Sequence, residues 1–175
     1  MSDLKSRMTI AEGDITKLGV EAIVNAANSR LLPGSGVCGA IHRAAGPQLA
    51  EACEKIYRCP TGEARLTPGF KLKAKYVIHA VGPVWNGGKV NEDALLASAY
   101  RSSLELARDN AVASIAFPAI STGTYGFPLA RATGIAIKTV ADFLRGSDTP
   151  VRVVFACFGA DVTEAYRKAL SEILT

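Results

Sequence analysis

The sequence predicts a single α/β domain, in which the strands of a sheet alternate along the chain with helices that cover it. Short apolar runs typical of buried strands, such as Ala22-Ile-Val24 and Tyr76-Val-Ile-His-Ala-Val81, are separated by longer segments with apolar residues at helical spacing. The chain has 175 residues, of which 49% are hydrophobic, and this is enough for one compact core. No repeat, linker or low-complexity tract divides the chain, so one domain is expected over residues 1–175.

Apolar periodicity and breakers such as Pro60-Thr-Gly62 set the boundaries of these elements. The predicted strands cover residues 7–13, 22–24, 63–68, 76–81, 114–120 and 151–158. The predicted helices cover residues 39–58, 91–109, 128–144 and 161–174, with Pro128 in the first turn of the third and Asp161 as the N-cap of the fourth. Two glycine-containing loops stand out because each joins a strand to the helix that follows it.

The first of these loops runs from Asn25 to the start of the helix near Gly39. Gly34, Gly36 and Gly39 allow positive φ and let backbone amides approach a ligand closely. The first turn of the helix presents unpaired N–H groups that carry partial positive charge. The loop therefore predicts an anion site that suits a phosphate.

Gly34 to Gly39 also fits the GxGxxG pattern of dinucleotide-binding Rossmann domains. In that fold the first glycine follows the strand directly, and an acidic residue closes the next strand about 20 residues later. Here residues 25–33 intervene, and Glu51 and Glu54 lie within the predicted helix. The spacing excludes a Rossmann unit.

The second loop follows the buried strand over 114–120 and has the sequence Ser121-Thr-Gly123-Thr-Tyr125-Gly126-Phe-Pro128. It too leads from a strand end into a helix N-terminus. Two such junctions in one small α/β domain can converge on a single anion, whereas one alone is a weak signal. Their convergence predicts a diphosphate ligand.

The two loops resemble the ligand loops of the macrodomain family, which binds ADP-ribose, and the first is similar to that of the MacroD-type hydrolases. Those proteins carry Asn-Ala-Ala-Asn, a run of glycines and a Val-Asp-Gly step before Ile-His-x-Ala-Ala-Gly. This chain has Pro33 and Ser35 among the glycines and Cys38 where the aspartate stands. The resemblance extends from Gly13 to the last helix and implies a three-layer α/β/α fold with a mixed six-stranded sheet.

The resemblance also implies roles for individual residues. Asp14 would accept a hydrogen bond from the exocyclic amine of adenine, and Phe158 would pack on the adenine ring. Asn28 would orient the distal ribose as the catalytic residue, and Tyr125 would cover that ribose. The substrate-binding residues that it implies are Asp14, Ile15, Asn28, Gly36, Val37, Cys38, Ser121, Thr122, Gly123, Thr124, Tyr125, Gly126 and Phe158.

Several of these and neighbouring residues have a plainer interpretation. Asp14 can equally be a helix cap, because aspartate before Ile-Thr-Lys can accept a backbone N–H. Asn25 is the candidate for a turn residue. His42 is interpreted as a structural hydrogen-bonding residue rather than a catalyst. Trp85 is expected to pack beside Gly82-Pro-Val84, and Phe127 to close the core under the second loop.

Two functions from different classes follow from the resemblance. The first is a metal-independent hydrolase that removes ester-linked ADP-ribose from acidic side chains or deacetylates O-acetyl-ADP-ribose, with water attack assisted by the substrate. The second is a module that binds ADP-ribose without cleaving it, and Cys38 in place of the aspartate favours it. Cys38 is expected to pack under the phosphates, with a thiolate nucleophile four residues from His42 as the alternative.

Composition limits the remaining possibilities. The net charge of +4 is mild and forms no basic stripe, so an anionic ligand fits and a nucleic acid does not. No apolar run reaches the roughly 20 residues of a membrane span, and no signal peptide is apparent, so a cytoplasmic monomer is expected. Without a CxxC pair and with two histidines, no zinc site or other cofactor is expected, and the cysteines at 38, 53, 59 and 157 should be free thiols.

Overall fold

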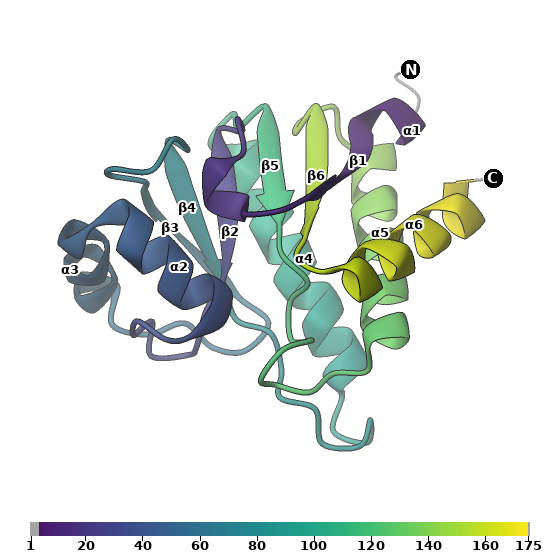
Figure 1. The fold of residues 1–175 in the computed structure, drawn as a ribbon, viewed down its shortest axis with the longest axis horizontal. Coiled ribbons are helices and arrows are strands. Elements are labelled where there is room, and N and C mark those ends of the chain that lie inside the picture. The colour runs from purple at the N-terminus through teal and green to yellow at the C-terminus, as the bar shows by residue number, and fades with distance from the viewer. Residues whose placement is uncertain (1–3, 175) are drawn as a thin grey trace.

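Six strands form one mixed sheet in the order β1-β6-β5-β2-β4-β3 (Figure 1). The computed structural model describes residues 4–174. All neighbouring strands are parallel except β3, which runs antiparallel to β4. The strands are β1 (Met8–Glu12), β2 (Ala22–Ala26), β3 (Ala64–Pro68), β4 (Tyr76–Ala80), β5 (Ser114–Phe117) and β6 (Arg152–Cys157). The predicted mixed six-stranded sheet is confirmed.

Helices cover both faces of this sheet and complete the three layers (Figure 1). They are α1 (Leu4–Arg7), α2 (Gly36–Ala45), α3 (Pro47–Ile56), α4 (Glu92–Asp109), α5 (Leu129–Arg145) and α6 (Ala160–Leu174), with a 3-10 turn η1 at Ile15–Lys17. Side chains alternate along β2, so that Val24 packs in the core under α4 and α5 while Ile23 packs under α2 and α3. Each face of the sheet therefore has its own hydrophobic core.

The long helix expected over 39–58 is wrong, because the structure has two helices there. Gly46 lies between them with φ 90°, a conformation that glycine adopts without strain. Its N–H bonds the His42 carbonyl at 3.1 Å and closes α2. Pro47 then begins α3, where its missing N–H is not needed, and it disfavours helical backbone in the residue before it. The apolar spacing continues across this break and so conceals it.

Two predicted helix starts also differ from the structure. Asp161 is not the N-cap of α6, because the helix begins at Ala160 and Asp161 lies in its first turn. There its carboxylate still interacts favourably with the positive end of the helix. Pro128 is the N-cap of α5 rather than its first helical residue. Within residues 4–174, no helix is both long and apolar enough to cross a membrane.

The parallel strands place five carboxyl ends at one edge of the sheet. The chain leaves β2 toward α2 on one face, whereas it leaves β5 toward α5 on the other, and these two strands are neighbours. Such a topological switch point opens a crevice outside the carboxyl ends of the strands, where α/β proteins bind their ligands. Both glycine loops start at this point.

Candidate functional site

The sequence-predicted site residues gather at this one edge of the sheet. Asn28 follows β2, the loop 121–126 follows β5, Asp14 follows β1 and Phe158 follows β6. The Gly13 N–H bonds the Cys157 carbonyl at 3.0 Å, which holds the ends of β1 and β6 together. The loops before α2 and before α5 lie at the same edge (Figure 1). Residues far apart in the sequence are therefore neighbours at the switch point.

The first loop ends in an open helix N-terminus. Ser35 is the N-cap of α2, and its side chain makes no capping hydrogen bond. Gly36 follows with φ 58°, and no atom lies within 4 Å of the position that a Cβ would take. Helix geometry leaves the amides of Gly36, Val37 and Cys38 without intrahelical acceptors, while the Gly39 N–H bonds Ser35. Three N–H groups are thus available to an anion.

Close packing explains why Gly39 is glycine. A Cβ on Gly39 would lie 2.5 Å from the Gly34 carbonyl oxygen, closer than real contacts allow. The loop backbone therefore lies directly against the first turn of α2. This contact keeps the loop and the helix N-terminus in one fixed arrangement.

The second loop is folded by its own backbone. Phe127 N–H bonds the Ser121 carbonyl at 2.9 Å, and Gly126 N–H bonds the Gly123 carbonyl at 3.0 Å. Ser121 and Gly126 have positive φ of 68° and 71°. The amides of Gly123, Thr124 and Tyr125 take no part in these turns, so this loop also offers donors for an anion.

Ser121 has a second unusual feature. Its hydroxyl is buried and has no hydrogen-bond partner among residues 4–174. It lies against Gly82, where any Cβ would collide with the Ser121 hydroxyl and with Ile120. The second loop and the end of β4 are therefore in direct contact.

Asp14 has the capping role that the sequence allows. Its Oδ1 accepts bonds from the Thr16 hydroxyl at 2.7 Å and the Thr16 amide at 2.9 Å, and it is the N-cap of η1. Both bonds lower the pKa of Asp14 below its usual range, and the bond from the Thr16 hydroxyl has the larger effect. The Oδ2 oxygen makes neither bond, so the cap leaves an acceptor at the edge of the site. Phe158, 79% exposed, is on the neighbouring strand end.

Asn28 closes the first loop. Its Nδ2 donates to the Leu32 carbonyl at 2.8 Å, and its Oδ1 accepts the Leu32 N–H at 3.0 Å. An amide has two donor hydrogens and two acceptor lone pairs, so one of each remains for a ligand. Asn28 is half-buried, whereas the Ile15 side chain, predicted to bind substrate, lies in the core. Ile15 can offer a ligand only its backbone.

Asn25 is not a turn residue, in contrast to the sequence interpretation. It lies within β2 and is 1% exposed. Its Nδ2 lies 3.1 Å from Nδ1 of His79 on β4 and 3.7 Å from Sγ of Cys38. Its Oδ1 is buried without a partner among the described residues. No local pattern in the sequence predicts this pairing, because the two partners are 54 positions apart.

Cys38 is 6% exposed and lies under the first loop. Its thiol accepts a hydrogen bond from Nδ2 of Asn25 and donates one to the Leu32 carbonyl, and each distance is 3.7 Å. Both ring nitrogens of His42 are buried without a partner among residues 4–174, so His42 does not activate this thiol. Burial lowers the pKa of His42. The geometry favours packing over a thiolate nucleophile.

The aromatic residues near the second loop match their predicted structural roles. Phe127 is 2% exposed in the core, and the Trp85 ring packs on it with a centroid distance of 4.7 Å. Tyr125 is half-buried within the loop. All four cysteines are free thiols, as predicted, and all are buried. Among residues 4–174, no group of three or more His, Cys, Asp or Glu side chains is arranged to hold a metal ion.

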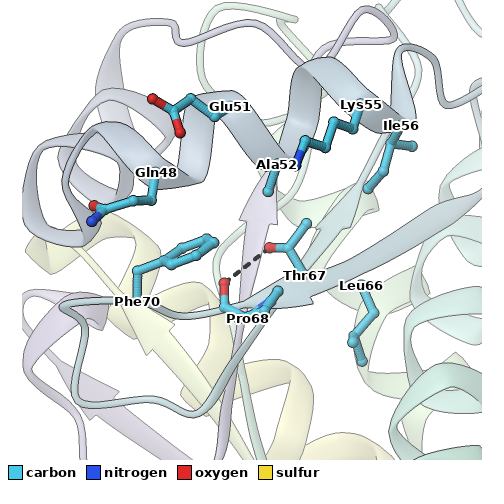
Figure 2. Close-up of a pocket in the computed structure, with 9 residues that line it drawn as sticks. All are labelled: Gln48, Glu51, Ala52, Lys55, Ile56, Leu66, Thr67, Pro68 and Phe70. Carbon is cyan, nitrogen blue, oxygen red and sulfur yellow. Dashed lines mark hydrogen bonds between the residues drawn. The ribbon is translucent and has the colours of Figure 1, made fainter.

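A shallow cavity of about 360 Å³ lies elsewhere, between α3 and β3 (Figure 2). Because β3 runs antiparallel to β4, Thr67 and Pro68 near its carboxyl end lie at the opposite edge of the sheet from the two glycine loops. The residues around the cavity are Gln48, Glu51, Ala52, Lys55, Ile56, Leu66, Thr67, Pro68 and Phe70. It shares no residue with the predicted site.

Comparison with known proteins identifies the family of this chain. The sequence matches the Macro domain family over residues 24–136. A Macro domain-containing protein of Methanosarcina mazei is 59% identical over 168 residues, which is 96% of this chain and 90% of that protein. A protein of Escherichia fergusonii named O-acetyl-ADP-ribose deacetylase is 53% identical over 173 residues, covering 97% of this chain and 98% of its own length.

Solved structures show the same fold. The Oceanobacillus iheyensis macrodomain with ADP superposes with a TM-score of 0.89 at 43% identity, over 94% of this chain and 90% of that one. The Trypanosoma brucei macrodomain in complex with ADP-ribose has a TM-score of 0.89 at 44% identity, over 94% of this chain and 69% of that one. At these identities the likeness includes sequence as well as fold.

Proposed function

This chain belongs to the macro domain family, and from that membership we propose that it binds ADP-ribose and hydrolyses esters of it. The substrates we propose are O-acetyl-ADP-ribose and proteins that carry ADP-ribose on an acidic side chain. The relative from Escherichia fergusonii, named O-acetyl-ADP-ribose deacetylase and 53% identical, supports the first of these. The reaction class is the same for both, since each substrate is a carboxylic ester of the distal ribose.

The observation that carries the proposal is the pair of amide clusters at the β2/β5 switch point. The first turn of α2 and the segment Gly123–Tyr125 each present N–H groups that the fold leaves unused. Two donor clusters from opposite faces of the sheet suit the two phosphates of a diphosphate. Backbone amides bind charge without reading a base or a sugar, so the adenine and the distal ribose at the two ends of the ligand must be recognised by other groups.

We assign the adenosine to the end of the site formed by β1 and β6. Asp14 offers Oδ2 to the exocyclic amine of adenine, which guanine lacks at that position. Phe158 offers an exposed ring for stacking on the base. The distal ribose then lies at the other end, between Asn28 and Tyr125.

In the reaction, the two loops bend the diphosphate so that a water molecule is held between a phosphate oxygen and the distal ribose. The water oxygen forms a bond to the acyl carbon of the ester while the phosphate oxygen takes a proton from the water. The bond between the acyl carbon and the ribose oxygen then breaks, and the ribose oxygen receives a proton and leaves as a hydroxyl. Asn28 orients the ribose with its remaining N–H and lone pair, because an amide does not compete for the proton. The products from either substrate are a carboxylic acid and ADP-ribose.

A non-catalytic reader of ADP-ribose is the second candidate, and one observation favours it. Cys38 stands where MacroD-type hydrolases have an aspartate, and its thiol is engaged with Asn25 and Leu32. The same residues would then contribute affinity alone.

One assay separates the two candidates. The purified protein is given a glutamate-ADP-ribosylated protein and, in parallel, O-acetyl-ADP-ribose, and ADP-ribose release and acetate release are followed under single-turnover conditions. Turnover of either substrate above a buffer control supports the hydrolase. Tight ADP-ribose binding in calorimetry without turnover of either substrate would assign the reader function. Absence of ADP-ribose binding would overturn both.

A further inference from the structure

The loop that joins β4 to α4, residues 81–91, is folded around a single carboxylate. Glu92 is 1% exposed and accepts the amides of Asn86, Gly88 and Val90 at 2.7, 2.9 and 2.8 Å. Burial alone raises the pKa of Glu92, but these amides outweigh it and lower the pKa to about 2. The carboxylate therefore stays charged at working pH and holds the loop in one conformation.

This loop encloses Trp85. A Cβ on Gly88 would lie 2.9 Å from the ring carbon Cη2, so the loop backbone lies directly on the indole. The guanidinium of Arg131 lies 5.1 Å from the ring centroid, within cation–π distance. Arg131 is itself oriented by two bonds to Asp93, at 2.8 and 2.7 Å. The indole thus has contacts from α5 and its own loop, and Asp93 on α4 holds the contact from α5 in place.

Trp85 also contacts the second glycine loop, and so links that loop to residues 81–91. The backbone N–H of Trp85 donates to the Tyr125 carbonyl at 2.8 Å, and its ring packs on Phe127. The internal turns of that loop leave the Tyr125 carbonyl unused, so Trp85 supplies a bond from outside the loop at the residue assigned to the distal ribose. The hydrogen bond joins the main chains of the two loops, while the indole packing on Phe127 adds a side-chain contact at the same point.

We propose that Trp85, held by the Glu92-centred loop, is a positioning residue that fixes Tyr125 over the distal ribose during ester hydrolysis. The inference rests on the proposed function, in which Tyr125 covers that ribose. Trp85 and Glu92 touch no reacting atom in this scheme and act through Tyr125. Their effect should therefore appear in turnover more than in affinity, because misplacing a reacting group lowers the rate of the chemical step.

Intrinsic fluorescence provides the first test, since Trp85 is the only tryptophan of the chain. Titration with ADP-ribose should change its emission with the dissociation constant that calorimetry gives. AMP, which lacks the distal ribose, should leave the emission unchanged even at saturation. An equal response to AMP and ADP-ribose would overturn the inference.

Glu92→Gln provides the second test, because a glutamine has one acceptor oxygen and cannot hold all three amides. We expect kcat to fall about 10- to 100-fold, with a smaller change in ADP-ribose affinity. Gly88→Ala, which pushes a methyl group against the indole at φ 86°, should act in the same direction. Asp142→Asn is the matched control, because that carboxylate pairs with Lys138 and Arg145 on α5 and should leave kcat unchanged.

The two tests separate failure of this inference from failure of the proposed function. If the wild type shows no turnover, the hydrolase is refuted. The emission of Trp85 with ADP-ribose and with AMP then still decides whether this residue responds when a distal ribose occupies the second glycine loop. A hydrolytic wild type together with folded Glu92→Gln and Gly88→Ala variants of unchanged kcat refutes the positioning role alone. Circular dichroism at the assay temperature establishes that each variant is folded.

Discussion

The side-chain amide of Asn25 donates a hydrogen bond to Nδ1 of His79 across 3.1 Å, and so links strands β2 and β4 beneath the first glycine loop. Because Nδ1 accepts this bond, Nε2 carries the proton and donates to the Thr67 hydroxyl at 3.0 Å. The second N–H of Asn25 reaches Cys38, whose thiol bonds the same Leu32 carbonyl as Asn28. A continuous chain of hydrogen bonds thus runs from the core to the proposed catalytic residue.

The first prediction concerns the pH dependence of stability. Burial, and then the neighbouring His42, lower the pKa of His79 to about 3, from 6.5. The unfolded chain therefore binds a proton that the folded protein does not, once the pH falls below about 6.5. The free energy of unfolding should decrease as the pH falls from about 6.5 toward 3, by up to about 1.4 kcal/mol per pH unit.

Urea unfolding at a series of pH values measures this effect. His79→Gln removes the titrating group, so its stability should depend less steeply on pH than that of the wild type between about pH 6.5 and pH 4.5. Other groups titrate in both proteins and cancel in the difference. Equal slopes for the two proteins would show that His79 is not held neutral in the folded state.

The second prediction concerns Asp14. Asp14→Ala should weaken ADP-ribose binding by about 1 to 3 kcal/mol, the scale of a charge-assisted hydrogen bond. It should also remove the preference for adenine over guanine in the ligand. Calorimetry with both nucleotides measures each effect. Thr16→Val, which removes the hydroxyl bonded to Oδ1 but keeps the carboxylate, is the control and should bind normally. Unchanged affinity in Asp14→Ala would leave Asp14 as a cap alone.

The third prediction tests the amide clusters. No atom lies within 4 Å of a Cβ placed on Gly123, so Gly123→Val should fold, while its side chain blocks the approach of a phosphate to the loop amides. ADP-ribose binding should be lost, as it should in Gly36→Val, although the φ of 58° at Gly36 adds backbone strain there. Calorimetry combined with circular dichroism measures binding and folding together.

Gly19→Val is the matched control for this pair. Gly19 is equally open to a Cβ and precedes β2, so it lies at the opposite edge of the sheet from the two loops. This variant should bind ADP-ribose as the wild type does. Normal binding by both Gly123→Val and Gly36→Val would mean that the amides do not hold the phosphates.

The sequence predicted the parts of this molecule that depend on local pattern. Apolar runs located all six strands, and glycines between strand and helix located both loops. Gly46-Pro47 is a recognisable helix-breaking pair in the sequence. However, the apolar spacing continues across it, and this spacing led to the prediction of one helix. Phe127 and Trp85 were also assigned to packing, and the structure agrees.

Pairings across the fold could not be predicted in this way. Asn25 was predicted to be a turn residue because asparagine is common in turns and two of them follow this strand. Its partner His79 lies on another strand, and only the sheet order brings the two together. The role of Glu92 was hidden because its three partners are backbone amides of a loop that has no sequence signature. Asn28 was assigned to the ligand, and its bonds to Leu32 show that it also shapes the loop.

The last prediction concerns Cys38 and Asn28. Asn28→Ala should remove most of the hydrolytic activity, because it takes away the group that orients the ribose and also opens the bonds to Leu32. Cys38→Ala should leave the activity nearly intact, since a buried, hydrogen-bonded thiol without a basic partner is a poor nucleophile. Cys38→Asp should accelerate the reaction, because a carboxylate there can orient or deprotonate the water, a contribution of about 10²- to 10⁴-fold in general acid–base catalysis.

Single-turnover release of ADP-ribose from a glutamate-modified protein compares the wild type with these three variants. ADP-ribose affinity, measured alongside, separates loss of chemistry from loss of binding, and Cys38→Ala and Cys38→Asp should both retain it. Loss of activity in Cys38→Ala would restore the thiolate mechanism, with attack by sulfur in place of water. An inactive wild type that Cys38→Asp converts into a hydrolase would assign the natural protein to the readers of ADP-ribose, and would identify position 38 as the residue that separates the two functions.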